Sequence, residues 1–222
     1  MRPTEQYRVL VACECSGRVR DAFIKRGISA ISCDIQPTEV PGPHYQGDVC
    51  DIINDGFSLM IAHPPCTHLC VSGARHFYRK QKEQAAALDF VRLLMSAPIP
   101  HIAVENPVSV ISSHIRKPDQ IIQPWMFGHE AQKTTCLWLK NLPKLTPTDV
   151  VGRGEFVTFK SGKKHPAWYA AALSLPPKER AKLRSRTFEG IADAMAEQWG
   201  AYIMESVATG KQQPQPNSTA GK

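Results

Sequence analysis

Residues 7–17, YRVLVACECSG, decide the fold class of this chain. YRVLVA is an apolar, β-branched run, which is typical of a strand that is buried on both faces of a sheet. CECSG follows as a glycine-containing loop, and VRDAFIKRG (19–27) then shows helical spacing, with Val19, Phe23 and Ile24 on one face. The stretch therefore predicts a strand–turn–helix unit.

The alternation of strands and helices continues along the chain. The further strand-like runs are ISAISCDI (28–35), FSLMIA (57–62), HIAVEN (101–106) and TTCLWL (134–139). Residues 81–97 form an amphipathic pattern, in which the residues expected to face inward are Ala86, Phe90, Leu93 and Leu94. This order predicts an α/β domain with a doubly wound, mostly parallel sheet.

The composition is that of a globular protein with a basic balance of charge. The 222 residues are 42% hydrophobic and 21% charged, which suits one main domain. The apolar runs are too short for a transmembrane helix or a signal peptide, so a cytoplasmic protein without membrane contact is expected. Seven cysteines then predict free thiols, and a net charge of +7 is compatible with a nucleic-acid partner.

The loops that follow the first strands are candidates for cofactor binding. Amides at a helix N-terminus after the CECSG loop suit an anionic group, although a simple strand-to-helix turn is the alternative. Asp34 ends the second strand 17 residues beyond Gly17, where an acid accepts ribose hydroxyls in nucleotide-binding folds. The alternative role for Asp34 is a helix cap or a solvated turn. Asp48 is a candidate for an adenine contact.

The sequence AHPPCTH (62–68) places a cysteine directly after a strand and two prolines. Prolines fix φ and donate no backbone hydrogen bond, so this loop is stiff. Cys66 is a candidate nucleophile if nearby positive charge favours its thiolate, and a buried turn cysteine is the alternative. A zinc site is not favoured, because no second ligand pair completes the local His and Cys residues. We therefore predict no metal.

Glu105 lies where the strand HIAVEN ends and the chain turns. A carboxyl buried at such a point is expected to have a raised pKa and to donate as well as accept a proton. The alternative is a surface acid that caps the following helix.

Taken in order, the SG turn, the acid after the second strand, PPC and EN resemble the DNA cytosine-5 methyltransferases. The resemblance implies that Cys66 adds to C6 of a flipped-out cytosine, after which C5 attacks the methyl group of S-adenosylmethionine. It further implies that Glu105 engages N3 and the exocyclic amine, and that Asn106 orders the loop. The stretches KTTCLWL and SRTFEGIADAMAEQW resemble short phage-encoded forms, which suggests evasion of host restriction.

The same resemblance implies further site residues. Those expected to line the S-adenosylmethionine site are Glu14, Cys15, Ser16, Gly17, Asp34, Ile35, Asp48 and Pro64. Those expected to contact DNA are Arg75, Lys133, Lys163, Lys164 and Trp168.

The resemblance also divides the chain. Residues 1–143 are the expected catalytic core, 144–184 a small basic, β-rich segment in place of a target-recognition domain, 185–207 a helix that packs back on the core, and 208–222 a disordered tail. So small a recognition segment predicts short or relaxed sequence specificity. The first loop departs from the glycine-rich family pattern, and no QxRxR motif is present.

Three alternative functions use the same scaffold. An amino-methyltransferase would need a polar amide or acid before PP and an aromatic residue after it, and HPPC has neither. A modified donor or a nucleotide substrate is compatible with the motifs. A catalytically silent nucleic-acid-binding protein is the third alternative.

Overall fold

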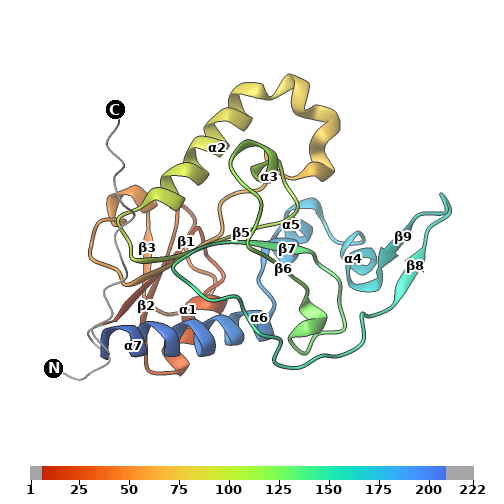
Figure 1. Cartoon of the computed structure of the whole chain (residues 1–222). Coiled ribbons are helices and arrows are strands. Elements are labelled where there is room, and N and C mark those ends of the chain that lie inside the picture. The colour runs from red at the N-terminus through yellow and green to blue at the C-terminus, as the bar shows by residue number, and fades with distance from the viewer. Residues whose placement is uncertain (1–6, 209–222) are drawn as a thin grey trace, which may run out of the picture.

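The structure is a computed structural model that describes residues 7–208, and the predicted tail lies outside these residues apart from Ala208. Its centre is a seven-stranded sheet with the order β3-β2-β1-β4-β5-β7-β6 (Figure 1). The strands are β1 (Arg8–Ala12), β2 (Ser29–Asp34), β3 (His44–Gln46), β4 (Leu59–Ala62), β5 (His101–Asn106), β6 (Gln120–Ile122) and β7 (Thr135–Lys140). Strands β1 to β5 pair in parallel, and β7 is antiparallel to both β5 and β6.

This topology confirms the predicted doubly wound, mostly parallel α/β domain. The chain builds β1, β2 and β3 toward one edge and then returns to add β4 and β5 on the other side of β1. The order therefore reverses between β1 and β4. In open α/β sheets a ligand crevice forms outside the carboxyl ends of the strands at such a reversal.

Helices cover both faces of the sheet. The helical elements are α1 (Arg18–Lys25), η2 (Val49–Asp51), η3 (Val71–Arg79), α2 (Gln81–Ser96), α3 (Ile111–His114), η4 (Pro124–Met126), α4 (Ala167–Ala172), α5 (Pro177–Ser185), α6 (Glu189–Ala194), η5 (Met195–Trp199) and α7 (Gly200–Ala208). In Figure 1 α2 lies on one face, and α1, α6 and α7 lie on the other. No helix within residues 7–208 is both long and apolar enough to cross a membrane.

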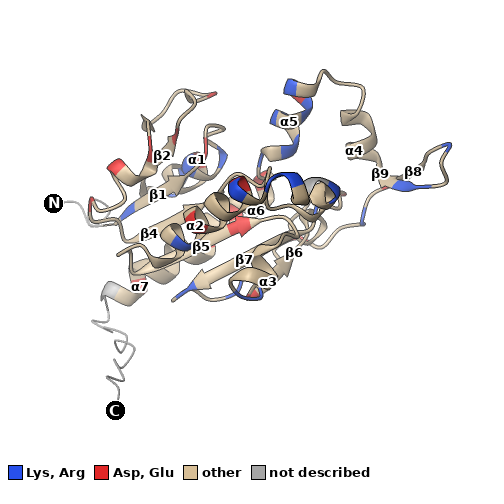
Figure 2. Ribbon diagram, turned by 90° about the horizontal axis from the view of Figure 1, so that it is seen from above, with Lys and Arg blue, Asp and Glu red and all other residues tan. Residues whose placement is uncertain are grey.

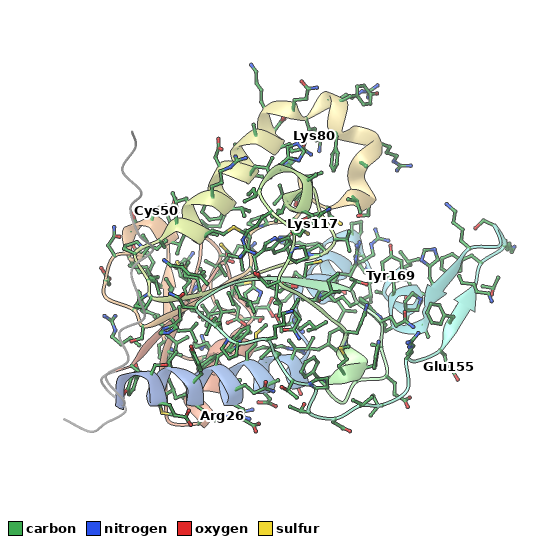
Figure 3. All side chains as sticks on the ribbon, viewed as in Figure 1. Arg26, Cys50, Lys80, Lys117, Glu155 and Tyr169 are labelled. Carbon is green, nitrogen blue, oxygen red and sulfur yellow. The ribbon has the colours of Figure 1, made fainter. Side chains whose placement is uncertain are left out.

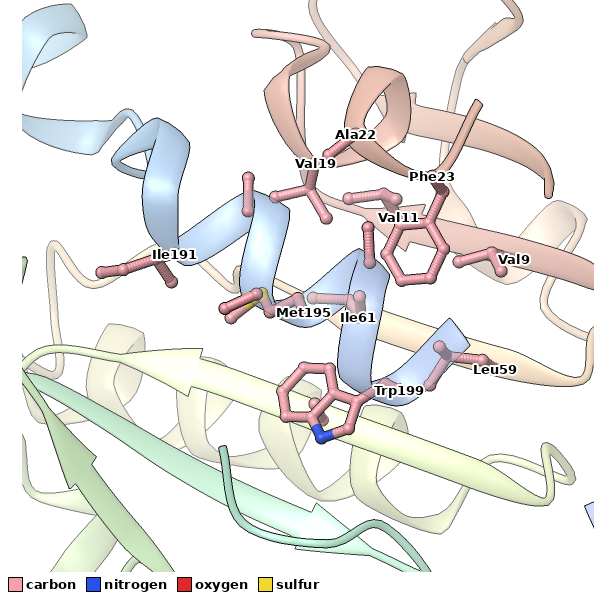
Figure 4. Close-up of a cluster of buried hydrophobic side chains, with 14 of the residues drawn as sticks. Val9, Val11, Val19, Ala22, Phe23, Leu59, Ile61, Ile191, Met195 and Trp199 are labelled. Carbon is pink, nitrogen blue, oxygen red and sulfur yellow. The ribbon is translucent and has the colours of Figure 1, made fainter. Parts of the chain in front are cut away.

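Each central strand divides its side chains between two hydrophobic cores. Val9 and Val11 of β1 join the core under α1 and α6, which Figure 4 shows, whereas Leu10 joins the core under α2. Alternate residues of a strand point to opposite faces, so a continuous apolar run fills both layers. In α1, Val19 and Phe23 are buried as expected, but Ile24 is 40% exposed.

The buried face of α2 differs in part from the prediction. Leu94 is buried as expected and Phe90 is half-buried against the core, but Leu88 and Val91 are buried as well, whereas Ala86 and Leu93 are exposed. Leu88, Val91 and Leu94 are three residues apart, so they lie on one side of the helix, and this side faces the sheet. Leucine residues are common on both sides of α2, so composition alone did not determine which side faces inward.

The C-terminal helical run, residues 189–208, changes its winding midway. α6 and α7 are α-helical, but η5 between them is a π-helical turn. Ile191, Met195, Trp199 and Ile203 are all buried, at a strict spacing of four residues. An α-helix turns about 100° per residue, so such a stripe would drift around it by about 40° at each step. The wider π turn offsets this drift and keeps the stripe on the core.

Residues 144–151 run along the core, where Leu145 is buried and the amides of Thr148 and Val151 donate to the carbonyls of Met126 and Trp125. Residues 152–184 project from the domain and are less β-rich than predicted. They contain a short hairpin of β8 (Phe156–Thr158) and β9 (Lys164–Pro166), followed by the helices α4 and α5. Figure 1 shows the hairpin extending away from the sheet, and Figure 2 shows basic residues along α5 and at the hairpin turn. α5 buries none of its residues.

Candidate active site

The loops singled out in the sequence meet at one edge of the sheet. Ala12 of β1 is in register with Cys33 of β2 and Ala62 of β4, and Ala62 is in register with Val104 of β5. The residues that follow these strands therefore emerge side by side. This edge includes the point where the strand order reverses.

The loop after β4 is held to the strands on both sides of it. The His63 amide donates to the Ala12 carbonyl over 2.9 Å, and Asn106 donates from Nδ2 to the Pro64 carbonyl, also over 2.9 Å. Pro64 and Asn106 are both buried. The Cys66 carbonyl then accepts from the amides of Leu69 and Cys70, which closes one helical turn. The backbone around Cys66 is thus fixed by its neighbours.

Glu105, at the end of β5, faces this loop. Its Oε2 lies 3.2 Å from His63 Nδ1, and the two side chains are only 15% and 11% exposed. Burial alone would raise the pKa of Glu105, but the bond and charge of His63, the charge of Lys133 and a bond from Thr135 together lower it. The expected raised pKa is therefore wrong, and Glu105 is ionised at rest.

The pKa of the Cys66 thiol is shifted in the opposite direction to that of Glu105. Its pKa is raised, first by burial of the sulfur and then by the charges of Cys70 and Glu105, while Lys133 acts to lower it. Cys66 is nevertheless an exposed residue at the loop surface. The resting pair is thus a neutral thiol and an anionic carboxylate.

Lys133 is the cation of this site. Burial lowers its pKa, and the charges of Glu105 and Cys66 act in the other direction. Its Nζ donates to the Arg186 carbonyl over 2.9 Å and lies 6.0 Å from the ring centre of Phe188. Lys133 was expected to contact DNA, and the structure places it within the electrostatic reach of Cys66 and Glu105.

The loop after β1 is organised by Glu14. This buried carboxylate accepts from the amides of Val19 (2.8 Å) and Arg20 (3.3 Å) and from the Ser16 hydroxyl (2.9 Å). The N-terminal amides of α1 that we expected to bind a cofactor anion are therefore already satisfied within the protein. Gly17 adopts φ 73°, a conformation that favours glycine.

Arg20 is a buried residue that sequence reasoning missed. Its guanidinium is fully buried and donates to Asp21, to the hydroxyls of Ser32 and Thr38, and to carbonyls of the 40–43 loop. It thereby ties α1 to the loop after β2. A Cβ at Gly17 would lie 2.5 Å from Arg20 Nη2, so close packing also requires glycine there. In the sequence Arg20 looks like an ordinary surface arginine.

The acids after β2 and β3 make local bonds and surround Cys13. Asp34 accepts from the Gln36 amide and Asp48 from the Cys50 amide, each over 2.9 Å. Hydrogen bonding to Cys50 lowers the pKa of Asp48. Burial, followed by the charges of Asp34, Cys33 and Asp48, raises the pKa of Cys13 to about 12. This end of the sheet is electronegative. Ile35, beside it, is 76% exposed.

The residues expected to bind DNA fall into two groups. Lys163 and Lys164 are exposed on the hairpin, and Arg75 is exposed on η3. Trp168 instead is half-buried, because its indole Nε1 donates to the Gln132 carbonyl over 3.0 Å and its ring packs edge-on against Phe188. Trp168 therefore docks the segment of residues 152–184 onto the core.

Tyr169 presents a different aromatic face. It stacks on His165 at 5.3 Å, and the Arg184 guanidinium lies 5.0 Å from its ring centre. Figure 3 shows Tyr169 close to the base of the hairpin.

Glu39, in the loop after β2, anchors the same segment. Its carboxylate pairs with Lys182 at 3.1 Å and with Arg186, and the Cys15 thiol lies 3.9 Å from its Oε1. Burial acts to raise the pKa of Glu39, but its bonds to Arg186 and Lys182 outweigh this effect and lower it. Cys15, expected in the cofactor site, is thus part of this anchor. Among residues 7–208 no group of three or more His, Cys, Asp or Glu could hold a metal ion.

Comparison with known proteins finds matches among solved structures only. No protein-family model and no curated protein matches the sequence. A solved structure that matches is a triple mutant of DNMT2 from Spodoptera frugiperda, with a TM-score of 0.39 and 12% sequence identity. The likeness covers 66% of this chain and 55% of that one, so the chain spans about half the length of its structural match.

Proposed function

We propose that this protein is an S-adenosylmethionine-dependent DNA methyltransferase that modifies C5 of cytosine through a covalent bond to Cys66. The observation that carries the proposal is the electrostatic coupling of Cys66, Glu105 and Lys133 at the carboxyl edge of the sheet, where the strand order reverses. A thiol beside an anionic carboxylate and a cation is the set that addition to a pyrimidine requires.

The resting protonation states define the first chemical step. As the Cys66 sulfur bonds to C6 of cytosine, its proton passes to Glu105, and Glu105 passes it on to N3. One S–C bond forms, one S–H bond breaks, and the proton ends on the base. Lys133 stabilises the thiolate that develops as the proton leaves. C5 then carries the electron density that attacks a methyl group.

The residues at the neighbouring strand ends fit the proposed cofactor. S-adenosylmethionine would supply the methyl group as a cationic sulfonium. Asp34 and Asp48 make this end of the sheet electronegative, which suits a cation and hydroxyl groups. Glu14, Ser16 and Gly17 shape the adjoining loop. The carboxylate of S-adenosylmethionine would not bind the N-terminus of α1, because the Glu14 carboxylate already accepts from the amides there.

Exposed cations on the projecting segment are the proposed DNA contacts. Lys163 and Lys164 would neutralise phosphates, as would Arg75 on η3. The stacked Tyr169 adds an aromatic face, and such faces bind bases with little sequence preference. We expect short or relaxed sequence specificity, and a role in protecting phage DNA from host restriction is part of the proposal.

A nucleoside digest tests the proposed function. Purified protein is incubated with mixed-sequence DNA and S-adenosylmethionine, and the nucleosides are separated and identified by mass. We expect 5-methylcytosine from the wild type and from Cys70→Ala, and none from Cys66→Ala. N4-methylcytosine or N6-methyladenine would identify an amino-methyltransferase. DNA binding without any product would identify a silent binding protein or a different donor.

A further inference from the structure

The backbone of His63 is fixed by its neighbours on both sides. Its backbone amide continues the ladder to β1 by donating to Ala12, and the two prolines that follow fix the chain direction. Asn106 then holds the carbonyl of Pro64. The His63 side chain therefore leaves the sheet from a fixed point between β1 and β5.

The hydrogen bond to Glu105 determines which ring nitrogen of His63 carries the proton. An ionised carboxylate only accepts, so Nδ1 must be the donor over the 3.2 Å that separates it from Oε2. His63 Nε2 is buried and has no partner among the described residues.

The buried polar atoms without a partner gather around this site. In residues 7–208 the side-chain atoms of this kind are His63 Nε2, His68 Nδ1, Asn106 Oδ1 and Ser109 Oγ. Three of them belong to the segments that follow β4 and β5, and the fourth belongs to Asn106, the last residue of β5. Such unsatisfied groups are uncommon in folded proteins and mark sites where structure serves function.

We propose that His63 is a positioning residue for Glu105: its Nδ1–H group fixes the carboxylate in one orientation and keeps it anionic, ready to accept the proton of the Cys66 thiol. His63 keeps its own proton throughout, since it only donates a hydrogen bond. The hydrogen bond by which His63 orients Glu105, here called the hold on Glu105, is a property of the resting protein. The role of the oriented carboxylate in proton transfer rests on the proposed function.

Several other groups face Glu105 and act on its ionisation. Lys133 and Thr135 favour the anion, and the thiols of Cys66 and Cys136 are coupled to its charge. These groups belong to β7, the segment before it and the loop after β4. A test must therefore change His63 while leaving them in place.

Titration of Glu105 by NMR tests the hold directly. The protein is labelled with glutamate carrying ¹³C at Cδ, and the Glu105 signal is assigned by its absence in Glu105→Gln. In His63→Leu we expect the Glu105 midpoint to rise by about one pH unit, because a bond to the charged form is lost. In His63→Asn, whose amide can replace the Nδ1 donor, we expect the wild-type midpoint.

A second variant guards against misfolding. His63→Gln places its amide near the position of Nε2 and not of Nδ1, so it should titrate like His63→Leu while preserving a polar side chain. The midpoint of Glu105 staying at its wild-type value in both His63→Leu and His63→Gln would overturn the proposal. An upward shift in His63→Asn equal to that in His63→Leu would overturn it too.

The pH dependence of kcat/KM tests whether the oriented Glu105 carboxylate accepts the thiol proton. The acid limb of kcat/KM should move to higher pH in His63→Leu, because Glu105 must be ionised to accept the thiol proton, while KM for DNA stays unchanged. A wild-type protein that makes no methylated product would refute the proposed function, and the NMR titration would still decide whether His63 holds Glu105. An active His63→Leu with an unmoved acid limb would refute the use of this hold in catalysis.

Discussion

The loops after β4 and β5 and the segment of residues 152–184 are held to the protein in opposite ways. The loops are fixed by backbone bonds to neighbouring strands and by buried side chains such as Asn106. The segment has a helix with no buried residue and an exposed hairpin, and the contacts that tie it to the core include the Glu39 anchor and the indole of Trp168. Its joint to the core is formed largely by polar and aromatic side chains.

The difference suits the two tasks of the proposed function. A covalent step needs atoms held in one geometry, and the sheet supplies this around Cys66 and Glu105. Contact with an extended polyanion needs charge and reach, which the segment supplies without a core of its own. Changes in the first region should therefore act on rate, and changes in the second on binding.

The largest effect should come from Glu105→Gln. The amide has the size of the carboxylate but cannot accept the thiol proton, so kcat/KM should fall by about 10²- to 10⁴-fold. Initial rates of methyl transfer measure this loss, and DNA affinity should be unchanged. Glu83→Gln, at an exposed position of α2, is the matched control. A Glu105→Gln variant within threefold of the wild-type rate would contradict the assigned role.

The next largest effect should come from Arg20→Met, which tests whether the rigid region includes α1 and the loop after β2. It leaves Asp21 and the acceptors around the 40–43 loop without their buried cation, which should cost about 3–5 kcal/mol of unfolding free energy. Urea denaturation measures the loss. Arg26→Met, at the end of the same helix with partly exposed ion pairs, should cost less than about 1 kcal/mol. Equal losses in the two variants would show that burial of Arg20 contributes nothing.

Glu39→Gln should loosen the projecting segment while leaving the sheet intact. Loss of the charged bonds to Lys182 and Arg186 should cost about 1.5–3 kcal/mol of docking free energy. Limited proteolysis should then cut residues 152–188 faster than the core.

The same joint should depend on pH. The pKa of Glu39 is lower in the folded protein than its ordinary value, so its contribution is complete above the ordinary value and is lost as the pH falls through the folded value. Proteolysis of the wild type, with an acid-tolerant protease, should accelerate in that acidic window. Glu39→Gln should show no such acceleration, and an identical pH response in both proteins would exclude Glu39 as its source.

The smallest effect should come from the hairpin cations. Lys163→Ala with Lys164→Ala should reduce the slope of log affinity against log salt by about 1 for each phosphate that these lysines neutralise, with kcat unchanged. DNA binding measured at several salt concentrations gives the slope. Lys117→Ala, at an exposed position after α3, should leave it as in the wild type. An unchanged slope in the double variant would place the DNA elsewhere.

The sequence predicted the parts of this structure that depend on local pattern. Apolar runs identified the strands, and the position of loops such as HPPC and VENP at strand ends followed from their order. The pKa of Glu105 could not be predicted, because it depends on His63, 42 residues away, and on Lys133. The Glu39 anchor joins residues 147 positions apart, and no spacing rule reaches that far.

The π turn in the C-terminal helix has a consequence for the length of the chain. Deleting the exposed Glu197 would leave the buried positions Ile191, Met195, Trp199 and Ile203 separated by four, three and four residues, which is the stripe of a regular α-helix. The helix therefore carries one residue that its packing does not need, and can lose it without turning Trp199 away from the core. The same deletion at Arg92 in α2 would rotate everything beyond it by about 100°. We therefore expect the helical run of residues 189–208 to tolerate a one-residue deletion at its π turn, and α2 not to tolerate one.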